Sequence, residues 1–244
     1  MLGGGRDEKG RSPGVCEALG MRIGVIGGTG PAGQGIAVRL AAAGHDVVVG
    51  SRHRSRSETV VEQLRARWGD RVATLTAGDN ADAADQDLVV LATVWDAAID
   101  TATAHADALA GKVVVSMANG LEKGAREMRA LIPPEGSIAA AVQKVAPSAR
   151  VVAAFHLTPA SELADLDHEL SSDVLVVADD DAARTTVMDL AEDIPNLRTF
   201  DAGSLANAMA LEAMTAALIT VNIRHKGQAS IHLSGVHPRQ RPPR

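Results

Sequence analysis

The residues best suited to chemistry lie near the start of the chain, in a glycine-rich run that follows a short apolar stretch and precedes a helical pattern. In that setting a first glycine permits a tight turn, a second lets the backbone approach a pyrophosphate, and a third lets helix and strand pack closely. The helix N-terminus then offers free N–H groups and partial positive charge to the phosphates. The run predicts a dinucleotide-binding turn, with a purely structural turn as the alternative; its members are Gly28, Thr29, Gly30, Pro31, Ala32 and Gly33.

The residues after the second expected strand indicate which dinucleotide is bound. A site that prefers NAD places a carboxylate there, roughly 20 residues after the glycines, to hold the ribose 2′-hydroxyl. No Asp or Glu lies between Val47 and Ser57, and Ser51, Arg52 and Arg56 stand there instead. A hydroxyl and guanidinium groups suit a 2′-phosphate, because Arg forms bidentate, charge-assisted hydrogen bonds. We therefore predict NADP rather than NAD, with a solvated basic loop as the alternative.

Side chains for acid–base or nucleophilic catalysis are scarce. The chain has no Tyr, which excludes reductases that protonate a carbonyl with a Tyr–Lys pair, and none of its eight His residues has metal-ligand spacing. His156 is the exception, because it stands at the carboxyl end of an expected strand, where α/β sheets bind ligands. We expect this segment to contribute to the site, with His156 either transferring a proton or, the commoner outcome, serving as a structural residue. We expect no catalytic side chain and no metal.

Strand and helix patterns alternate along the chain, which is typical of a doubly wound parallel sheet. We therefore predict an α/β fold of Rossmann type, with a small, mainly helical C-terminal domain. The expected strands are 22–26, 46–49, 72–76, 88–92, 112–116, 150–155 and 173–178. The expected helices are 31–43, one from a capping box at Ser55 and Glu58 to Gly69, one capped by Asp96 and ended by Gly111, one near 137–145 and one starting at Asp181.

Domain boundaries follow from changes in this pattern. Residues 21–180 are expected to form an NADP-binding Rossmann domain, and residues 181–235 a small C-terminal domain. The stretch 205–221 is apolar most of the way round a helix, so it must be buried against its own sheet or against a second subunit. We favour a C-terminal domain that forms a homodimer; an internal core helix is the alternative.

The net charge, the length of the apolar segments and the cysteine count of the 244-residue chain limit its possible partners and its compartment. The formal net charge of −6 argues against nucleic acid or an anionic membrane as the main partner. The apolar segment 213–223 is about half of the roughly 20 residues that a spanning helix needs. Cys16 is the only cysteine, so a reducing cytoplasm is the expected compartment. Residues 1–20 are expected to be a disordered extension, or the result of a start codon placed before Met21, and residues 236–244 a loose tail.

With these residues considered, the chain resembles the NADPH-dependent F420 reductases, also called F420H2:NADP oxidoreductases. The likeness extends from Met21 to about Gly235 and is most specific in two places, the combination of GGTG with GSR and the histidine-bearing segment HLTPA. Two departures stand out: archaeal members tend to have Pro where Val94 stands, and the turn 117–120 is more polar than theirs. Further shared motifs are Val94-Trp95, Asp179-Asp180-Asp181, Asp201-Ala202-Gly203 and VNIRHKGQASIHLSG.

This resemblance implies a Rossmann domain and a smaller C-terminal domain, usually as a dimer, that bind NADP and coenzyme F420. The hydride would pass directly between the nicotinamide and a deazaflavin stacked on it between the two domains, so that positioning replaces acid–base catalysis. Arg224 and Lys226 are the candidates for binding the anionic tail of the deazaflavin. Residue by residue, the resemblance assigns the phosphates to Thr29, Gly30, Pro31 and Ala32, the 2′-phosphate to Ser51, Arg52 and Arg56, the nicotinamide side to Trp95, Ile99 and Ala160, and completion of the pocket to Ala229.

Two other functions stay open on the sequence alone. A related NADPH-dependent reductase could act on a flavin, an imine or a metal chelate, because the same fold carries many different sites. A non-catalytic NADPH-binding protein is the second alternative, which the lack of a ring-sized second pocket would favour. The function that we predict is hydride transfer between NADP(H) and coenzyme F420.

Overall fold

The computed structural model describes residues 20–239, so the expected N-terminal extension, Cys16 and the last five residues lie outside the described residues. An eight-stranded sheet forms the centre of this part, in the order β10-β9-β8-β5-β4-β1-β2-β3. Its strands are β1 (Arg22–Ile26), β2 (Asp46–Ser51), β3 (Leu75–Asp79), β4 (Leu88–Leu91), β5 (Val113–Ser116), β8 (Arg150–Ala153), β9 (Ser172–Ala178) and β10 (Leu197–Asp201).

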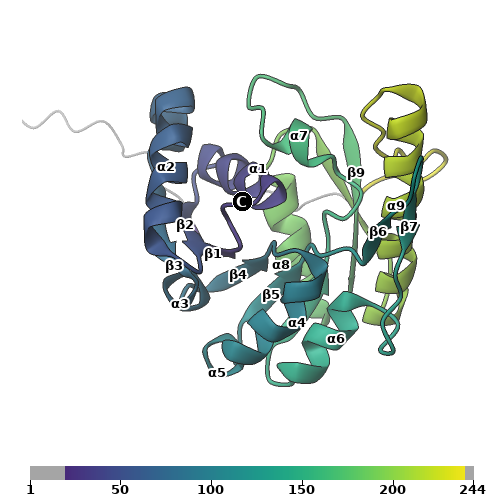
Figure 1. The fold of residues 1–244 in the computed structure, drawn as a ribbon, viewed down its shortest axis with the longest axis horizontal. Coiled ribbons are helices and arrows are strands. Elements are labelled where there is room, and N and C mark those ends of the chain that lie inside the picture. Colours follow the sequence, from purple (N-terminus) through teal and green to yellow (C-terminus); the bar gives the residue numbers. More distant parts are fainter. Residues whose placement is uncertain (1–19, 240–244) are drawn as a thin grey trace, which may run out of the picture.

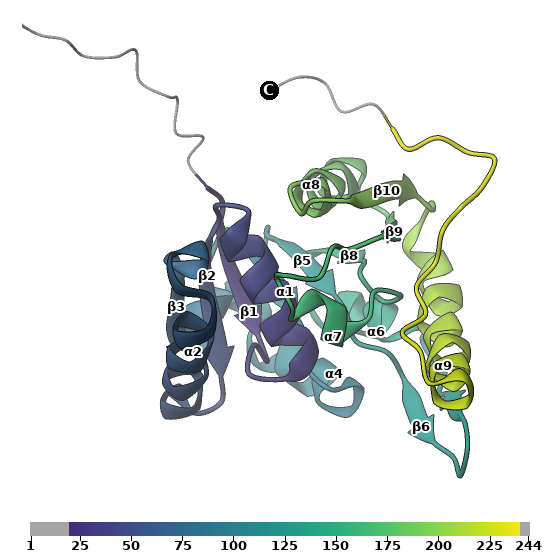
Figure 2. The same cartoon turned by 90° about the horizontal axis from the view of Figure 1, so that it is seen from above.

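Helices cover both faces of the sheet, as Figures 1 and 2 show, because the central strands are apolar on both sides. One face is packed by α1 (Pro31–Ala42), α2 (Arg54–Trp68), α7 (Ala160–Leu163) and α8 (Asp181–Glu192). The other face is packed by α3 (Asn80–Ala84), α4 (Trp95–Ala104), α5 (Ala106–Leu109), α6 (Ile138–Val145) and the start of α9 (Ala208–His225). This arrangement confirms the predicted doubly wound α/β fold.

The direction of the strands changes at one edge of the sheet. The neighbours β3, β2, β1, β4, β5 and β8 all pair in parallel, as predicted. In contrast, β9 pairs with β8 antiparallel, and β10 then pairs in parallel with β9. The loop from β8 to β9 contains only the short helix α7, so no long crossover helix brings the chain back in the parallel direction.

Several elements differ from their expected positions. The third strand begins at Leu75 rather than at residue 72, because 69–72 forms a 3-10 turn after α2. Two segments for which we predicted no strand are strands: β10, and the hairpin of β6 (Leu121–Lys123) and β7 (Met128–Ala130). The hairpin strands have three residues each and are only partly buried, and in β10 one of the two buried residues is the polar Thr199, so the sequence shows little of the apolar–polar alternation that indicates a strand.

Two predicted helix caps are wrong. The helix α2 starts at Arg54 directly after β2, so Ser55 and Glu58 lie inside it and no side chain caps it. The cap of α4 is Val94, and Asp96 lies in the first turn, where its charge still suits the positive helix end. The chain then breaks at His105, so the single helix expected here is two helices, α4 and α5.

The C-terminal part does not separate at residue 181, because α8 and β10 belong to the sheet and its core. The helix α9 stands apart from them (Figure 2) and packs on the hairpin β6–β7, where it contacts β7 (Figure 1). It is also longer than the apolar segment that we expected to be too short for a membrane span. By length and composition alone, 205–225 could cross a membrane, with 21 residues and a mean hydropathy of 1.3, although only 28% of its apolar window is buried.

Candidate functional site

The glycine-rich turn joins β1 to α1 and has little room for side chains. A Cβ atom on Gly33 would stand 2.6 Å from the carbonyl oxygen of Gly27 and 2.7 Å from the Cα atom of Gly28, so helix and strand require glycine there. A Cβ on Gly30 would meet only one atom, at 3.5 Å. Glycine at position 30 is therefore not needed by the protein's own packing, and the free space over it fits the close approach of a pyrophosphate.

The first turn of α1 is open to a ligand. Its N-cap, Gly30, offers no side chain to the helix, and Pro31 has no N–H to donate. The N–H groups of Ala32 and Gly33 lie in the first turn, where no preceding carbonyl of the helix can accept them. Backbone donors and the helix dipole thus point to the same place, which is a suitable setting for the phosphates of NADP.

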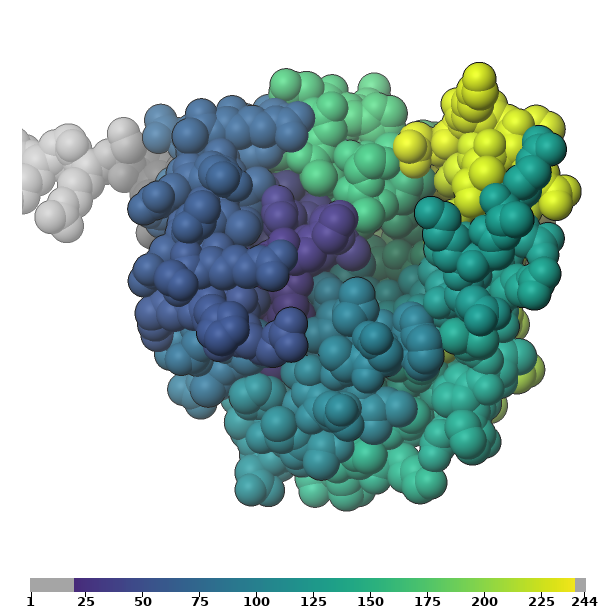
Figure 3. All heavy atoms as spheres, viewed as in Figure 1, coloured from purple at the N-terminus to yellow at the C-terminus, as the bar shows by residue number. Residues whose placement is uncertain are grey.

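A first cavity of about 430 Å³ runs from this turn along the carboxyl ends of the strands. Figure 3 shows the surface hollowed between the purple residues of α1 and the teal residues of the hairpin. The structure brings most of the predicted NADP residues to this cavity, namely Thr29, Gly30, Pro31, Ala32, Ser51, Arg52, Arg56 and Trp95. It is also lined by residues that we did not predict, among them His53, Asn80, Thr93, Met117, Asn119 and Leu121.

The arginines of the basic loop after β2 differ in whether their side chains have partners within the protein. The guanidinium group of Arg54 forms an ion pair with Asp82 and also reaches the carbonyl oxygen of Ala77. The side chains of Arg52 and Arg56, which line the cavity, form no ion pair or hydrogen bond within residues 20–239. Ser51 is buried beside them and accepts a hydrogen bond from the N–H of His53 at 3.4 Å. Two free guanidinium groups and a hydroxyl therefore lie together, as binding of a 2′-phosphate requires.

A second cavity of about 410 Å³ adjoins the first. Four residues line both of them: Ala32, Met117, Asn119 and Leu121. The second cavity is bounded by the segment after β8, by α9 and by the residues that follow α9, and it includes the predicted His156, Ala160 and Ala229. The side-chain oxygen of Asn222 accepts the N–H of Ala229 at 2.6 Å and so fixes this last wall.

His156 is buried at the base of the second cavity and makes one side-chain hydrogen bond, from its Nδ1 to the Oδ1 of Asn119 at 3.1 Å. The Oγ1 of Thr215 on α9 lies 2.9 Å from the same Asn119 oxygen and 3.1 Å from the carbonyl oxygen of His156. Burial lowers the pKa of His156 to about 4, so its ring is neutral at physiological pH. Burial and these hydrogen bonds favour the structural role for His156, and its part in a reaction stays a prediction.

The helix α9 is fixed to the body of the protein by a buried carboxylate. Glu212 accepts the backbone N–H groups of Ile138 at 2.8 Å and Ala139 at 3.0 Å, at the N-terminal end of α6. Burial raises the pKa of Glu212 to about 7, and the two hydrogen bonds only partly oppose this rise. The sequence offered no sign of this contact, because residues 138 and 212 are far apart in the chain.

Several predicted residues lie away from both cavities. Gly28 and Gly33 shape the turn from behind, and Ile99 lies on α4 outside the lining. Arg224 and Lys226 stand at the exposed end of α9, where Arg224 lies 3.8 Å from Glu127 of the hairpin loop, and neither lines a cavity. Within residues 20–239, no group of three or more His, Cys, Asp or Glu side chains is placed to hold a metal ion.

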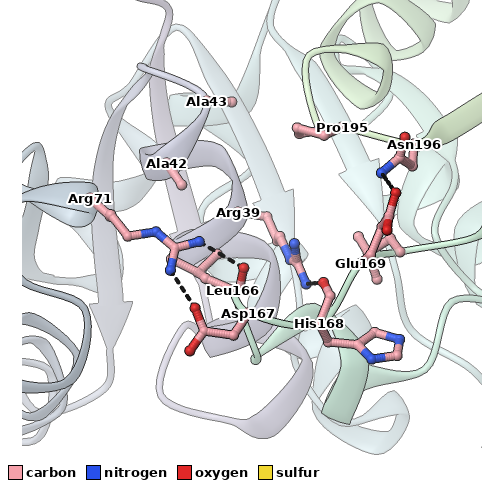
Figure 4. A pocket seen from close by; sticks show the side chains of 11 residues that line it. Arg39, Ala42, Ala43, Arg71, Leu166, Asp167, His168, Glu169, Pro195 and Asn196 are labelled. Carbon is pink, nitrogen blue, oxygen red and sulfur yellow. Dashed lines mark hydrogen bonds and ion pairs between the residues drawn. The ribbon is translucent and has the colours of Figure 1, made fainter.

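A third cavity, of about 370 Å³, lies at the other end of α1 (Figure 4). The buried guanidinium group of Arg39 donates there to the carbonyl oxygens of Glu162, Leu163, Asp165 and His168. Arg39 thereby holds the loop after α7 against α1, while Arg71 pairs with Asp167 in the same loop. These contacts give structural roles to Arg39, Arg71 and Asp167, and they fix α7, whose first residue lines the second cavity.

Comparisons with known proteins agree with the family resemblance described from the sequence. The family model of coenzyme F420-dependent NADP oxidoreductases matches residues 22–120. The F420-dependent NADP reductase of Methanocaldococcus jannaschii is 34% identical over 215 residues, which are 86% of this chain and 96% of that protein. The F420-dependent NADP reductase of Methanothermobacter thermautotrophicus is 32% identical over 217 residues, 87% of this chain and 94% of that protein. A solved structure from Arthrobacter sp. FB24, assigned as an F420-dependent NADP reductase, is 26% identical with a TM-score of 0.74, and the match covers 88% of this chain and 100% of that one.

Proposed function

The chain belongs to the family of coenzyme F420-dependent NADP oxidoreductases, and on this basis we propose that it transfers a hydride between NADP(H) and coenzyme F420. The observation that supports this reaction best is the pair of adjoining cavities. The first has the glycine turn and free arginines that NADP needs, and the second is large enough for a planar ring. Because the two share Ala32, Met117, Asn119 and Leu121, ligands in both would meet at these residues.

The bound coenzymes would supply the hydride chemistry, and the side chains of the protein would position them. Ser51, Arg52 and Arg56 would hold the 2′-phosphate, and the N-terminus of α1 the pyrophosphate. Met117 and Leu121 line both cavities with apolar side chains, which would exclude water from the path between the rings once both coenzymes are bound. Such a reaction needs reacting atoms about 3–3.5 Å apart rather than a side chain that exchanges protons.

The side chains that line the second cavity are consistent with direct hydride transfer between two bound rings. Among the described residues that line it, His156 is the one with an ionisable side chain, and burial keeps it neutral at physiological pH by lowering its pKa to about 4. A reductase that had to protonate its product would need a group that can donate a proton at the cavity. In the direct transfer that we propose, the hydride passes from one ring to the other, and the reduced deazaflavin would take up its one proton from solvent water, so no side chain at the cavity has to supply it.

The test is a two-coenzyme assay with the full chain. NADPH is added to oxidised coenzyme F420, and the loss of the visible absorbance of the deazaflavin is followed; we expect turnover that depends on both coenzymes. Oxidised flavin replaces the deazaflavin in a parallel reaction. Turnover with flavin alone would instead indicate a reductase of another acceptor, and binding of NADPH without turnover of either would indicate a non-catalytic protein.

We also propose that the protein is a cytoplasmic homodimer that pairs through α9. The outward face of this helix is apolar, with Met209 and Met214 each 44% exposed and Val221 43% exposed. Burial of such a face against a second copy would remove it from water, which is favourable by about 25 cal/mol per Å² of apolar surface. Light scattering coupled to size exclusion should give twice the chain mass, and Met214→Glu should reduce it to the monomer; a monomeric wild type would contradict the proposal.

A further inference from the structure

Asn119 occupies a distinctive position, directly after β5 at the junction of the two cavities. Its side chain is half-buried and lines both of them. It also connects three segments that are distant in sequence, since its partners His156 and Thr215 lie 37 and 96 residues away. The direction in which its amide group points therefore depends on the hydrogen bonds made by these two partners.

The tautomer of His156 fixes this direction. Its ring is neutral, so only one of the two nitrogens carries a proton, and its Nε2 is buried without a hydrogen-bond partner in the described part of the chain. A proton on Nε2 would leave a buried N–H unpaired, which proteins strongly avoid. The proton therefore lies on Nδ1, which donates to Asn119, and the atom of Asn119 that receives it must be the oxygen Oδ1.

With the oxygen facing inward, the NH₂ group of Asn119 faces the other way. The oxygen accepts from His156 and lies within hydrogen-bond distance of the Thr215 hydroxyl. The Nδ2 atom donates one N–H to the carbonyl oxygen of Met117 at 3.2 Å. An amide nitrogen carries two N–H donors, and the second one has no partner within residues 20–239.

We propose that this second N–H of Asn119 binds a carbonyl oxygen at the edge of the acceptor ring in the second cavity, and so selects acceptors that carry such a carbonyl. Asn119 lines the second cavity as well as the first, so its second N–H lies at their junction, where the edge of a ring in the second cavity can reach it. Deazaflavins and flavins have carbonyl groups on their pyrimidine ring, whereas simple imines and metal chelates have none there. Asn119 is thus a specificity-determining residue, and the inference rests on the proposed hydride transfer to a planar acceptor.

The decisive variant is Asn119→Asp. A carboxylate can still accept from His156 and Thr215, so the inward hydrogen bonds are kept. It has no N–H, so it loses the bond to the carbonyl oxygen of Met117 together with the donor offered to the ligand, and its charge repels a carbonyl oxygen. We expect the Kd and the KM for oxidised coenzyme F420 to rise about tenfold or more, because a hydrogen-bond donor is lost and a buried acceptor is left unpaired. The Kd for NADPH, measured by calorimetry, should change less than about threefold.

Two further variants separate a positioning role from general disturbance of the site. Thr215→Val removes one of the partners that orient the amide but leaves its N–H donors, so the Kd for coenzyme F420 should rise only about threefold, and Thr215→Ser should restore it. Asn207→Asp makes the same chemical change at an exposed position outside both cavities and should leave the Kd for both coenzymes unchanged.

The outcomes distinguish this inference from the proposed function. If the wild type reduces coenzyme F420 and Asn119→Asp, correctly folded by circular dichroism, binds it as well as the wild type does, the inference is wrong and the function stands. A loss of affinity for NADPH rather than for coenzyme F420 would also overturn it, since the donor would then serve the nicotinamide. If the wild type binds neither deazaflavin nor flavin in the titration, the function and the inference fail together.

Discussion

Replacing Arg52 by Ala gives the most direct test of the dinucleotide site. The guanidinium group of Arg52 lines the first cavity and forms no side-chain hydrogen bond or ion pair within the described residues, so its removal leaves no protein group unpaired. A hydrogen bond to a charged group contributes about 1.5–3 kcal/mol, and we take about 2 kcal/mol here because Arg52 is exposed and screened by salt. This loss corresponds to a rise of about 30-fold in the KM for NADPH.

The same variant should leave the KM for NADH nearly unchanged, within about twofold, because NADH has no 2′-phosphate to lose. Arg54→Ala is the matched control, since Arg54 stands two residues away but is paired with Asp82. We expect it to change the KM for NADPH much less than Arg52→Ala does. Steady-state kinetics with both nucleotides at two salt concentrations measure these effects. Equal losses for NADPH and NADH, or equal effects of the two Arg variants, would refute the reasoning.

Four further predictions concern the fold and the buried groups. Gly33→Ala would push a Cβ to 2.6 Å from the carbonyl oxygen of Gly27, so calorimetry should show weaker NADPH binding and a lower Tm. The pKa of Glu212, about 7 in the folded protein, lies above its ordinary value of 4.5; stability should therefore fall as pH rises from about 5 to 8, and Glu212→Gln should flatten this dependence in thermal unfolding. The pKa of His156 near 4 predicts no inflection from this residue in the kcat profile between about pH 5.5 and 8, and an inflection lost in His156→Gln would contradict its structural role. Arg39→Met should lower the free energy of unfolding by about 3 kcal/mol or more, because four carbonyl groups lose their donor, and Arg39→Lys should not restore it.

Much of the sheet could be predicted because its signals are local. The apolar runs of β1, β2, β4 and β5 and the glycine turn are continuous in sequence, and their order follows from the alternation of strands with helices. The strands β6 and β7 were missed because they have three residues each and are partly exposed, and β10 because one of its two buried positions is the polar Thr199, which breaks the apolar pattern. The reversal at β9 was missed for another reason: strand direction depends on how a connection crosses the sheet, and hydrophobic periodicity carries no information on it.

The residues of the site also differ in whether a local sequence signal could predict them. Residues of the NADP turn and the basic loop follow from spacing along one βαβ unit, so Thr29 and Arg52 could be found from the sequence. Asn119 could not, because its role arises from contacts with residues 156 and 215 that only the folded chain brings together. A polar residue directly after a parallel strand, at the edge where such sheets bind ligands, was the one signal that could have pointed to it.

The hairpin β6–β7 and the helix α9 come from different parts of the chain, yet they pack on each other, with the Thr220 hydroxyl 2.9 Å from the N–H of Met128. The hairpin is inserted between β5 and α6, and α9 is the last helix of the described chain. Both are additions to a sheet of the kind that binds nucleotides. Mutations in the hairpin and in α9 can change the shape of the second cavity, while the glycine turn and the arginines after β2 stay intact. A protein built in this manner can exchange the molecule that it reduces over evolutionary time and keep the same source of electrons.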